Sequence, residues 1–195
     1  MNAQTGAGVR GIQPLVQSAC REKIERDKKR GILNRPVRAM VVGIPNVGKS
    51  TFINALAGKA CTKTGVTKGK QWIRLNKNLE LLDTPGILWP KFEDQKVGER
   101  LAMIGSIKDE ILHADELAVA LLSYLHEKYP QKLKERYLIN SNEDAFKTLE
   151  EICINRKCFL KGEQPDLLRA AGMVLEDFRS GRIGRITLEH PEEWK

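Results

Sequence analysis

The segment at residues 43–51, GIPNVGKST, restricts the possible fold of this chain more than any other part of the sequence. It matches the pattern G-x-x-x-x-G-K-[S/T], follows the apolar run VRAMVVG and precedes a segment with helical spacing that stops at Gly58. A strand, such a loop and a helix in this order predict a phosphate-binding loop, because loop N–H groups and the positive end of the helix dipole both face an anion. The sequence therefore predicts an α/β fold that binds nucleotide phosphates.

The residues of this loop have distinct expected roles. Lys49 is expected to bridge the β- and γ-phosphates, and the hydroxyl of Ser50 is expected to bind Mg²⁺. The other predicted nucleotide contacts in the loop are Pro45, Asn46, Val47, Gly48 and Thr51.

A second apolar run, LELLD, ends at Asp83 and continues as Asp-x-x-Gly to Gly86. In a parallel sheet Asp83 would lie beside the phosphate loop and hold Mg²⁺ directly or through water, while the Gly86 N–H would contact a γ-phosphate. Thr67, between the two motifs, is the predicted switch threonine that closes on Mg²⁺ when the γ-phosphate is present. Thr62 and Thr64 lie close by and leave that assignment open.

Ile87 follows the Asp-x-x-Gly motif, where many guanine-nucleotide switches carry a glutamine that orients the attacking water. Isoleucine cannot orient water, so these residues leave open whether the chain hydrolyses a nucleotide. If it does, the predicted catalytic residues are Lys49, Thr67 and Gly86.

The pattern of elements changes near Pro90. Before it, residues 12–30 read as one helix ending at Gly31, and KQWIRLN and LELLD read as two strands joined by a hairpin turn at residues 76–78. After it the spacing is mostly helical, with a last short strand expected in GRITLE. We therefore expect two domains, residues 1–90 and 91–195.

Charge is distributed unevenly between these two parts. The whole chain carries +8, of which residues 1–90 contribute 16 Lys+Arg against 5 Asp+Glu and residues 91–195 contribute 17 against 20. A basic first part usually faces a polyanion, although a solvated lysine surface is the simpler alternative.

No apolar run approaches the roughly 18 residues of a membrane span. With no apolar signal core and no paired cysteine motif, we expect a cytoplasmic protein with reduced thiols.

Three segments together resemble the circularly permuted GTPases: GIPNVGKST, VTKGKQW and LLDTPGILWPKFED. The resemblance extends through SIKDEILHADELA to GRIGRITLE and so covers most of the chain. In that family the guanine-reading Asn-Lys-x-Asp and the Ser-Ala-x loop precede the phosphate loop. No Asn-Lys-x-Asp lies downstream of Asp83, and NAQTGAG is similar to the Ser-Ala-x loop, which places Asn2, Ala3 and Gln4 as base contacts.

The resemblance implies a fold of class α/β. It is a P-loop NTPase G domain with circularly permuted motif order over residues 1–90, followed by a mostly α-helical C-terminal domain over residues 91–195. The Asn-Lys-x-Asp motif is not among these residues, so the G domain is expected to lack its upstream part.

The resemblance also implies a function. It implies a GTPase that is slow alone and stimulated by the large ribosomal subunit, whose assembly it assists by binding the subunit and its RNA. Mg²⁺ and GTP or GDP are the implied ligands, and Asn46 matches an asparagine that holds K⁺ in related GTPases, unless it only shapes the loop. The protein is expected to be a monomer that binds neither DNA nor membrane.

Several alternatives stay open at the level of the sequence. The same phosphate loop could serve an ATP-using enzyme, and the chain could be a nucleotide-dependent interaction switch without turnover. In the acidic second part, RNA contact would need a local basic face such as Arg179, Arg182 and Arg185, or these arginines are only exposed residues near the chain end.

Overall fold

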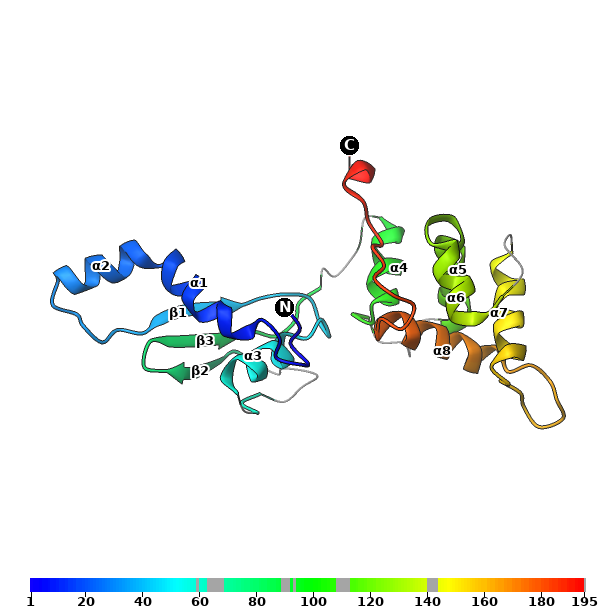
Figure 1. Cartoon of the computed structure of the whole chain (residues 1–195), viewed down its shortest axis with the longest axis horizontal. Coiled ribbons are helices and arrows are strands. Elements are labelled where there is room, and N and C mark those ends of the chain that lie inside the picture. Colours follow the sequence, from blue (N-terminus) through cyan, green and yellow to red (C-terminus); the bar gives the residue numbers. More distant parts are fainter. Residues whose placement is uncertain are drawn as a thin grey trace. The chain divides into compact units, whose positions relative to one another are not determined.

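The computed structural model describes residues 1–58, 60–62, 69–88, 92, 94–107, 113–139 and 144–194. The chain divides into two compact units, Met1–Pro90 and Lys91–Lys195 (Figure 1). Each unit has its own cluster of buried apolar side chains. The two units are therefore described separately.

The first unit is a three-stranded sheet in the order β1-β3-β2, in which β3 pairs parallel to β1 and antiparallel to β2. The predicted strands and the hairpin turn between β2 and β3 are confirmed. The elements of this unit are η1 (Val9–Gly11), α1 (Ile12–Ala19), α2 (Arg21–Lys29), β1 (Val37–Val41), α3 (Lys49–Ala57), β2 (Gln71–Asn76) and β3 (Leu79–Asp83).

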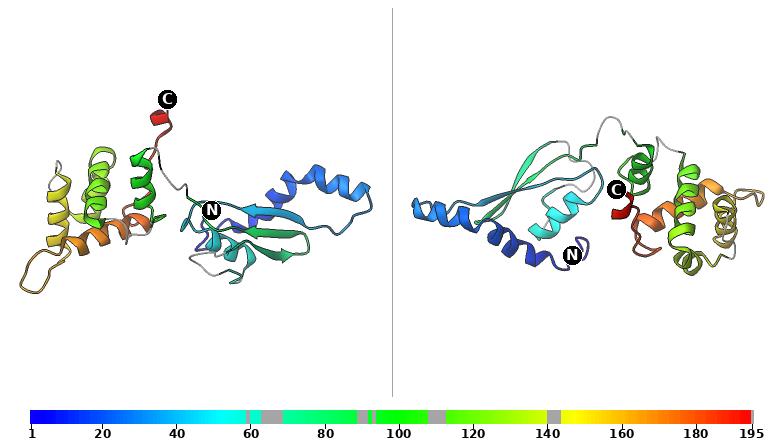
Figure 2. Two further views of the ribbon diagram at one scale, coloured as in Figure 1. Left: turned by 180° about the vertical axis from the view of Figure 1, so that it is seen from behind. Right: turned by 90° about the horizontal axis from the view of Figure 1, so that it is seen from above.

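One face of this sheet carries the core of the first unit. Alternate strand residues such as Val37, Leu81 and Ile73 are buried there against the fully buried Ile53 of α3. Figure 2 shows α1 and α3 on the same side of the strands. Alternation along the strands sends the intervening residues to the other face, as the period of two requires.

The single helix expected over residues 12–30 is wrong, because the chain breaks at Cys20 into α1 and α2. Cys20 has φ −101° and ψ 12°, outside the helical range. Val16, Cys20 and Ile24 all pack on the sheet. Over eight residues a straight helix would rotate Ile24 about 80° away from the direction of Val16. The break at Cys20 lets both side chains reach the same core.

The second unit is helical in its described residues. Helix α5 packs against each of the other four α-helices of this unit, and Leu117, Leu121 and Leu125, which recur every four residues along it, are all buried. The elements are α4 (Gln95–Met103), α5 (Ala114–Lys128), α6 (Pro130–Tyr137), α7 (Ala145–Asn155), α8 (Leu167–Arg179) and η3 (Pro191–Trp194).

The strand expected in GRITLE is wrong, because residues 184–189 form no strand. Two tyrosines hold this segment instead. The Tyr124 hydroxyl donates a hydrogen bond to the carbonyl of Thr187, and the Tyr129 hydroxyl accepts from the Thr187 N–H at 3.1 Å. Side chains of α5 and of the residue after it thus bind backbone groups that a strand partner would otherwise bind.

Candidate nucleotide-binding site

The phosphate loop connects the end of β1 to the start of α3. Asn46 and Gly48 have positive φ angles of 58° and 89°, and α3 begins at Lys49 directly after Gly48. Left-handed backbone conformations of this kind turn successive N–H groups toward a common centre, which suits an anion. The positive end of the α3 dipole adds to this preference.

Lys49 folds back across the loop that precedes it. Its Nζ donates hydrogen bonds to the carbonyl oxygens of Gly43, at 3.0 Å, and Ile44, at 2.7 Å. The ammonium group is thereby held over the loop rather than extended into solvent. A bound phosphate could replace these carbonyls as its partner, because phosphate oxygens accept charge-assisted hydrogen bonds more strongly.

The end of β3 lies beside the end of β1. Val41 pairs with Asp83 in the parallel register, and the Thr84 hydroxyl donates to the carbonyl of Val41 at 2.8 Å. The prediction that Asp83 ends a strand parallel to the one before the phosphate loop is confirmed. Asp83 is fully buried, with 0% of its surface exposed, and Ser50 in the first turn of α3 is also buried.

Gly86 lies directly against the backbone of the phosphate loop. A Cβ atom at Gly86 would stand 2.5 Å from both the Cα and the nitrogen of Pro45. Only a hydrogen fits at this distance, so the Asp-x-x-Gly loop and the phosphate loop are in contact. Ile87, the next residue, is 76% exposed.

Ser50 and Asp83 fit a magnesium site by their chemistry. A hydroxyl and a carboxylate are oxygen ligands of the kind that Mg²⁺ prefers, and both are buried on neighbouring elements. The described residues contain no group of three or more His, Cys, Asp or Glu side chains that could hold a metal. An ion here would thus need further oxygens from nucleotide phosphates and water, as is usual for Mg²⁺.

The N-terminal segment with Asn2, Ala3 and Gln4 forms a compact turn. Asn2 Oδ1 accepts hydrogen bonds from the N–H groups of Gln4, at 2.9 Å, and Thr5, at 3.1 Å. The turn leads into η1, and η1 packs against α3, the helix that follows the phosphate loop. Asn2 and Gln4 are exposed at its surface.

The threonines near the switch position differ in what the structure describes. Thr67, the predicted switch threonine, lies outside the described residues, as does Thr64. The hydroxyl of Thr62, the third candidate, lies 3.1 Å from Asn54 Oδ1 and 3.3 Å from the Ser50 carbonyl. Sequence reasoning missed Asn54, and its only signal was an amide side chain inside a helix that is otherwise mostly apolar.

The arginines proposed as a basic face are mostly engaged in the fold. Arg179 donates from Nε to the carbonyl of Met103, at 3.0 Å, and from its second guanidinium nitrogen to that of Ala102, at 2.9 Å. Arg182 pairs with the buried Asp177 at 3.0 Å. Arg179 is thus half-buried and bound within the fold, whereas Arg182, which pairs with Asp177, and Arg185 are both exposed.

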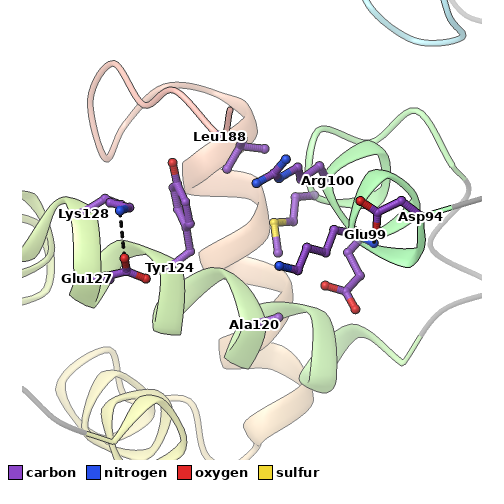
Figure 3. A pocket seen from close by; sticks show the side chains of 10 residues that line it. Asp94, Glu99, Arg100, Ala120, Tyr124, Glu127, Lys128 and Leu188 are labelled. Carbon is purple, nitrogen blue, oxygen red and sulfur yellow. Dashed lines mark hydrogen bonds and ion pairs between the residues drawn. The ribbon is translucent and has the colours of Figure 1, made fainter. Parts of the chain in front are cut away.

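A pocket of about 510 Å³ lies between α4, α5 and Leu188 in the second unit (Figure 3). Its charges balance, and Lys128 is paired with Glu127 at 2.8 Å, as Arg100 is with Glu189 at 3.3 Å. Balanced charges do not favour a polyphosphate. The charged side chains that line it are Asp94, Lys96, Glu99, Arg100, Glu127 and Lys128.

These features define the class of the protein: a phosphate loop after one strand, in contact with an Asp-x-x-Gly loop after a parallel strand, is the site of a P-loop NTPase. A family model described as 50S ribosome-binding GTPase matches residues 38–156. The chain is 47% identical to the ribosome biogenesis GTPase A of Bacillus cereus, over 100% of this chain and 67% of that protein. It therefore belongs to the ribosome biogenesis GTPase A family.

Two further comparisons agree with this assignment. The chain is 45% identical to the ribosome biogenesis GTPase A of Priestia megaterium, over 99% of this chain and 69% of that protein. The crystal structure of GNP-bound YlqF from T. maritima matches with a TM-score of 0.54 and 30% identity, covering 80% of this chain and 60% of that one. The chain thus spans about two thirds of the length of its curated relatives.

The resemblance to GTPases of this family is confirmed, and so is the presence of a P-loop GTPase domain of mixed α/β content. Among the residues that the structure describes, no helix is long and apolar enough to cross a membrane.

Proposed function

We propose that this chain binds GTP with Mg²⁺ at the phosphate loop and hydrolyses it to GDP and phosphate. The observation that carries this proposal is the contact of Gly86 with Pro45, because it joins the Asp-x-x-Gly loop to the loop that holds the phosphates. A γ-phosphate held by Lys49 would meet the Gly86 N–H at this junction. The Asp-x-x-Gly loop would then distinguish GTP from GDP.

The remaining residues of the site have proposed roles that follow from their chemistry. Ser50 and Asp83 would hold Mg²⁺ together with phosphate oxygens, and Thr67 would close on the same ion when GTP is bound. The turn with Asn2, Ala3 and Gln4 would contact the guanine base. The other loop contacts would be Pro45, Asn46, Val47, Gly48 and Thr51.

Water activation needs a group other than Ile87, whose exposed apolar side chain offers no hydrogen bond. We propose that K⁺ bound near Asn46 neutralises charge that develops during phosphoryl transfer. An arginine finger in the same role accelerates hydrolysis by roughly 10³–10⁵-fold in other GTPases. Turnover should therefore be slow alone and faster in potassium than in sodium.

The experiment measures GTP and ATP turnover in matched potassium and sodium buffers, with Lys49→Ala as the control for contaminating hydrolases. We expect hydrolysis of GTP alone, faster in potassium and lost in the variant. Equal use of ATP would contradict guanine specificity. GTP binding without turnover under every condition would support the alternative of an interaction switch.

We further propose that the chain acts in the cytoplasm, as a monomer, in assembly of the large ribosomal subunit. Residues 1–90 would form the circularly permuted G domain and residues 91–195 a helical domain that helps dock on the subunit. The names of the relatives support a role in ribosome assembly, and the basic first part suits contact with RNA phosphates.

In the second unit we propose that RNA contact uses Arg136, Arg156 and Arg182, which lie just at or after the C-terminal ends of α6, α7 and α8. Arg136 and Arg182 both bind the carboxylate of Asp177, at 2.8 and 3.0 Å. Arg136 and Arg156 both lie over the ring of Tyr137. A guanidinium has five N–H donors, and each arginine uses only some of them inward, which leaves others for phosphate.

A further inference from the structure

The loop between α7 and α8 is a short hairpin that carries exposed apolar side chains. Phe159 and Pro165 form an isolated antiparallel bridge, and the Leu160 N–H donates to the carbonyl of Gln164 at 2.8 Å. Figure 1 shows this loop extending beyond the end of α7. Phe159 is 38% exposed and Leu160 is 53% exposed. Backbone bonds thus hold two large apolar side chains at the surface.

The base of this loop is fixed to the core of the second unit. Cys158, just before Phe159, is buried, and its N–H donates to the carbonyl of Cys153 at 2.9 Å. The carbonyl of Cys158 accepts hydrogen bonds from the Asp166 N–H and from the Cys153 thiol, both at 2.9 Å. The loop is therefore held at both of its ends, so binding at its surface would cost little conformational entropy.

Further apolar side chains are exposed at the two helix ends that this loop joins. Ile154 lies in the last turn of α7 and Leu168 in the first turn of α8, and both are exposed. Single exposed apolar residues are common on folded proteins, whereas a group of them is typical of a binding surface. We call this group the α7–α8 corner; its residues are Ile154, Phe159, Leu160 and Leu168.

The charges around the α7–α8 corner favour a nucleic acid over a protein as its partner. The exposed basic side chains in or beside the loop are Arg156, Lys157, Lys161 and Arg169. The loop has one exposed acidic side chain, Glu163. Lysine is depleted in protein–protein interfaces, but it is a usual contact of nucleic-acid phosphates. An aromatic ring among basic side chains suits unpaired RNA, whose bases stack on aromatic rings.

We propose that Phe159 and Leu160 form a stacking site for one unpaired base of RNA, whose flanking phosphates meet Lys157 and Lys161. This inference rests on the proposed contact of the second unit with RNA, and it adds a base contact to the phosphate contact of Arg156. Every base has a π-face, so the site selects unpaired RNA rather than a sequence. Duplex RNA offers no free base face and does not use the site.

The experiment uses the full chain and two RNA probes, a short oligoadenylate and a duplex RNA of the same length. Phe159→Leu keeps an apolar side chain but removes the ring, Phe159→Tyr keeps the ring, and Leu160→Ala is a further variant. Phe146→Leu is the matched control, because Phe146 is 49% exposed in the first turn of α7, at the other end of that helix from the loop. The measurements are thermal unfolding and the affinity for each probe at several salt concentrations.

Phe159→Leu should bind oligoadenylate about fivefold to a hundredfold more weakly, which is the range for the loss of one stacked base. The slope of log K against log salt concentration should not change, because no phosphate contact is lost. Affinity for the duplex should also stay the same. Leu160→Ala should show a smaller loss of the same kind, and Phe159→Tyr and Phe146→Leu should stay within about twofold of wild type.

Wild-type affinity for oligoadenylate in a folded Phe159→Leu would overturn the inference, as would a changed salt slope or an equal loss for the duplex. If Phe159→Leu fails to fold, wild-type affinity in Leu160→Ala would overturn it. Weaker binding of Phe159→Leu to large subunits, with no change toward oligoadenylate, would assign the α7–α8 corner to a protein partner instead.

The same titrations separate this inference from the proposed phosphate contact on which it rests. If Arg156→Gln weakens RNA binding while Phe159→Leu does not, the phosphate contact stands and the stacking site is wrong. A wild-type chain that binds neither RNA probe would contradict the proposed RNA contact itself, and the stacking site with it.

Discussion

At the scale of single residues, Gly86 is placed where no other amino acid fits. The 2.5 Å distance from its would-be Cβ to two backbone atoms of Pro45 leaves no flexible side chain to move aside. Either the Asp-x-x-Gly loop or the phosphate loop must shift to accept a methyl group. The contact therefore ties the conformation of one loop to that of the other.

We predict that Gly86→Ala lowers GTP turnover by on the order of 100-fold, because a displacement of about 1 Å at a reacting group costs that much. GDP affinity should fall less, since GDP carries no γ-phosphate for Gly86 to meet. The control is Gly69→Ala, where a Cβ would meet nothing within 4 Å. Turnover and nucleotide titrations check this, and a Gly86→Ala variant with wild-type turnover would contradict it.

Ile87→Gln should change basal turnover by less than about tenfold, because glutamine in other GTPases acts together with charge neutralisation rather than alone. Ile87 is exposed, so the substitution should not disturb packing. Single-turnover hydrolysis in potassium measures the effect. A much larger gain would show that water orientation was the one missing part.

Local motifs and distant contacts differ in how well single residues could be predicted. The strand-terminal position of Asp83, beside the strand before the phosphate loop, followed from two apolar runs that end in phosphate-binding motifs. Asn54 could not be found in this way, because its partners Cys61 and Thr62 meet it only after the chain turns back at the end of α3. The spacing along α3 carries no information about that turn.

At the scale of elements, the C-terminal ends of α6 and α8 meet at a buried carboxylate. Asp177, on α8, accepts hydrogen bonds from Arg136 at 2.9 Å, Arg182 at 3.0 Å and the Tyr137 hydroxyl at 3.2 Å. Burial by itself raises the pKa of Asp177, but the bonds from Arg136 and Arg182 outweigh it and hold that pKa below its usual 3.8. Burial, with the nearby Asp177 charge, raises the pKa of Tyr137.

We predict that Asp177→Asn lowers the free energy of unfolding at pH 7 by about 2 kcal/mol, because the variant no longer forms hydrogen bonds to a charged group. The pKa of Asp177 is lower in the folded state, so the ionised carboxylate stabilises the fold above pH 3.8, and this contribution disappears as pH falls through the lowered value. Denaturant unfolding from pH 7 to pH 2 should show the two proteins converging in acid. A gap that stays constant with pH would contradict this.

The proposed RNA contact in the second unit is testable at Arg156, whose guanidinium donates a hydrogen bond to the carbonyl of Arg136 at 2.7 Å. We predict that Arg156→Gln weakens binding to large-subunit RNA. The slope of log K against log salt concentration should become shallower by about 0.7–0.9 for each RNA phosphate that the arginine neutralises in wild type. Lys147→Gln, which neutralises an exposed lysine in α7, the helix that ends just before Arg156, is the control. Equal slopes for both variants and wild type would remove Arg156 from the interface.

Secondary structure was predictable where the signal is local. The three strands and the hairpin turn follow from apolar alternation and the Asn-Lys-Asn sequence. The break at Cys20 depends on the sheet beneath it, and the path of residues 184–189 depends on Tyr124 and Tyr129 far away in the sequence. Tertiary contacts determine both the break and this path, and the local sequence pattern gives no indication of those contacts.

At the scale of the whole molecule, the two units have separate cores of different size. The second unit buries many apolar side chains along α5, α7 and α8, whereas the core of the first unit is smaller and centres on Ile53 and the sheet. The nucleotide site proposed here belongs to the first unit. Ligand binding should thus stabilise one unit selectively.

We predict two calorimetric unfolding transitions, of which only the one from the first unit moves upward with GDP and Mg²⁺. The shift should grow with ligand concentration, because stabilisation follows RT ln(1 + [L]/Kd). In Lys49→Ala the shift should be small. A single transition that moves as a whole would show instead that the two units unfold together.

Co-sedimentation with purified large subunits measures whether this chain is a GTP-dependent factor of the large ribosomal subunit. The chain would be loaded in parallel with a non-hydrolysable GTP analogue, with GDP or with no nucleotide. We predict strong binding with the analogue, weak binding with GDP, and loss of the difference in Gly86→Ala. Equal sedimentation with the analogue and with GDP, or none with either, would contradict it.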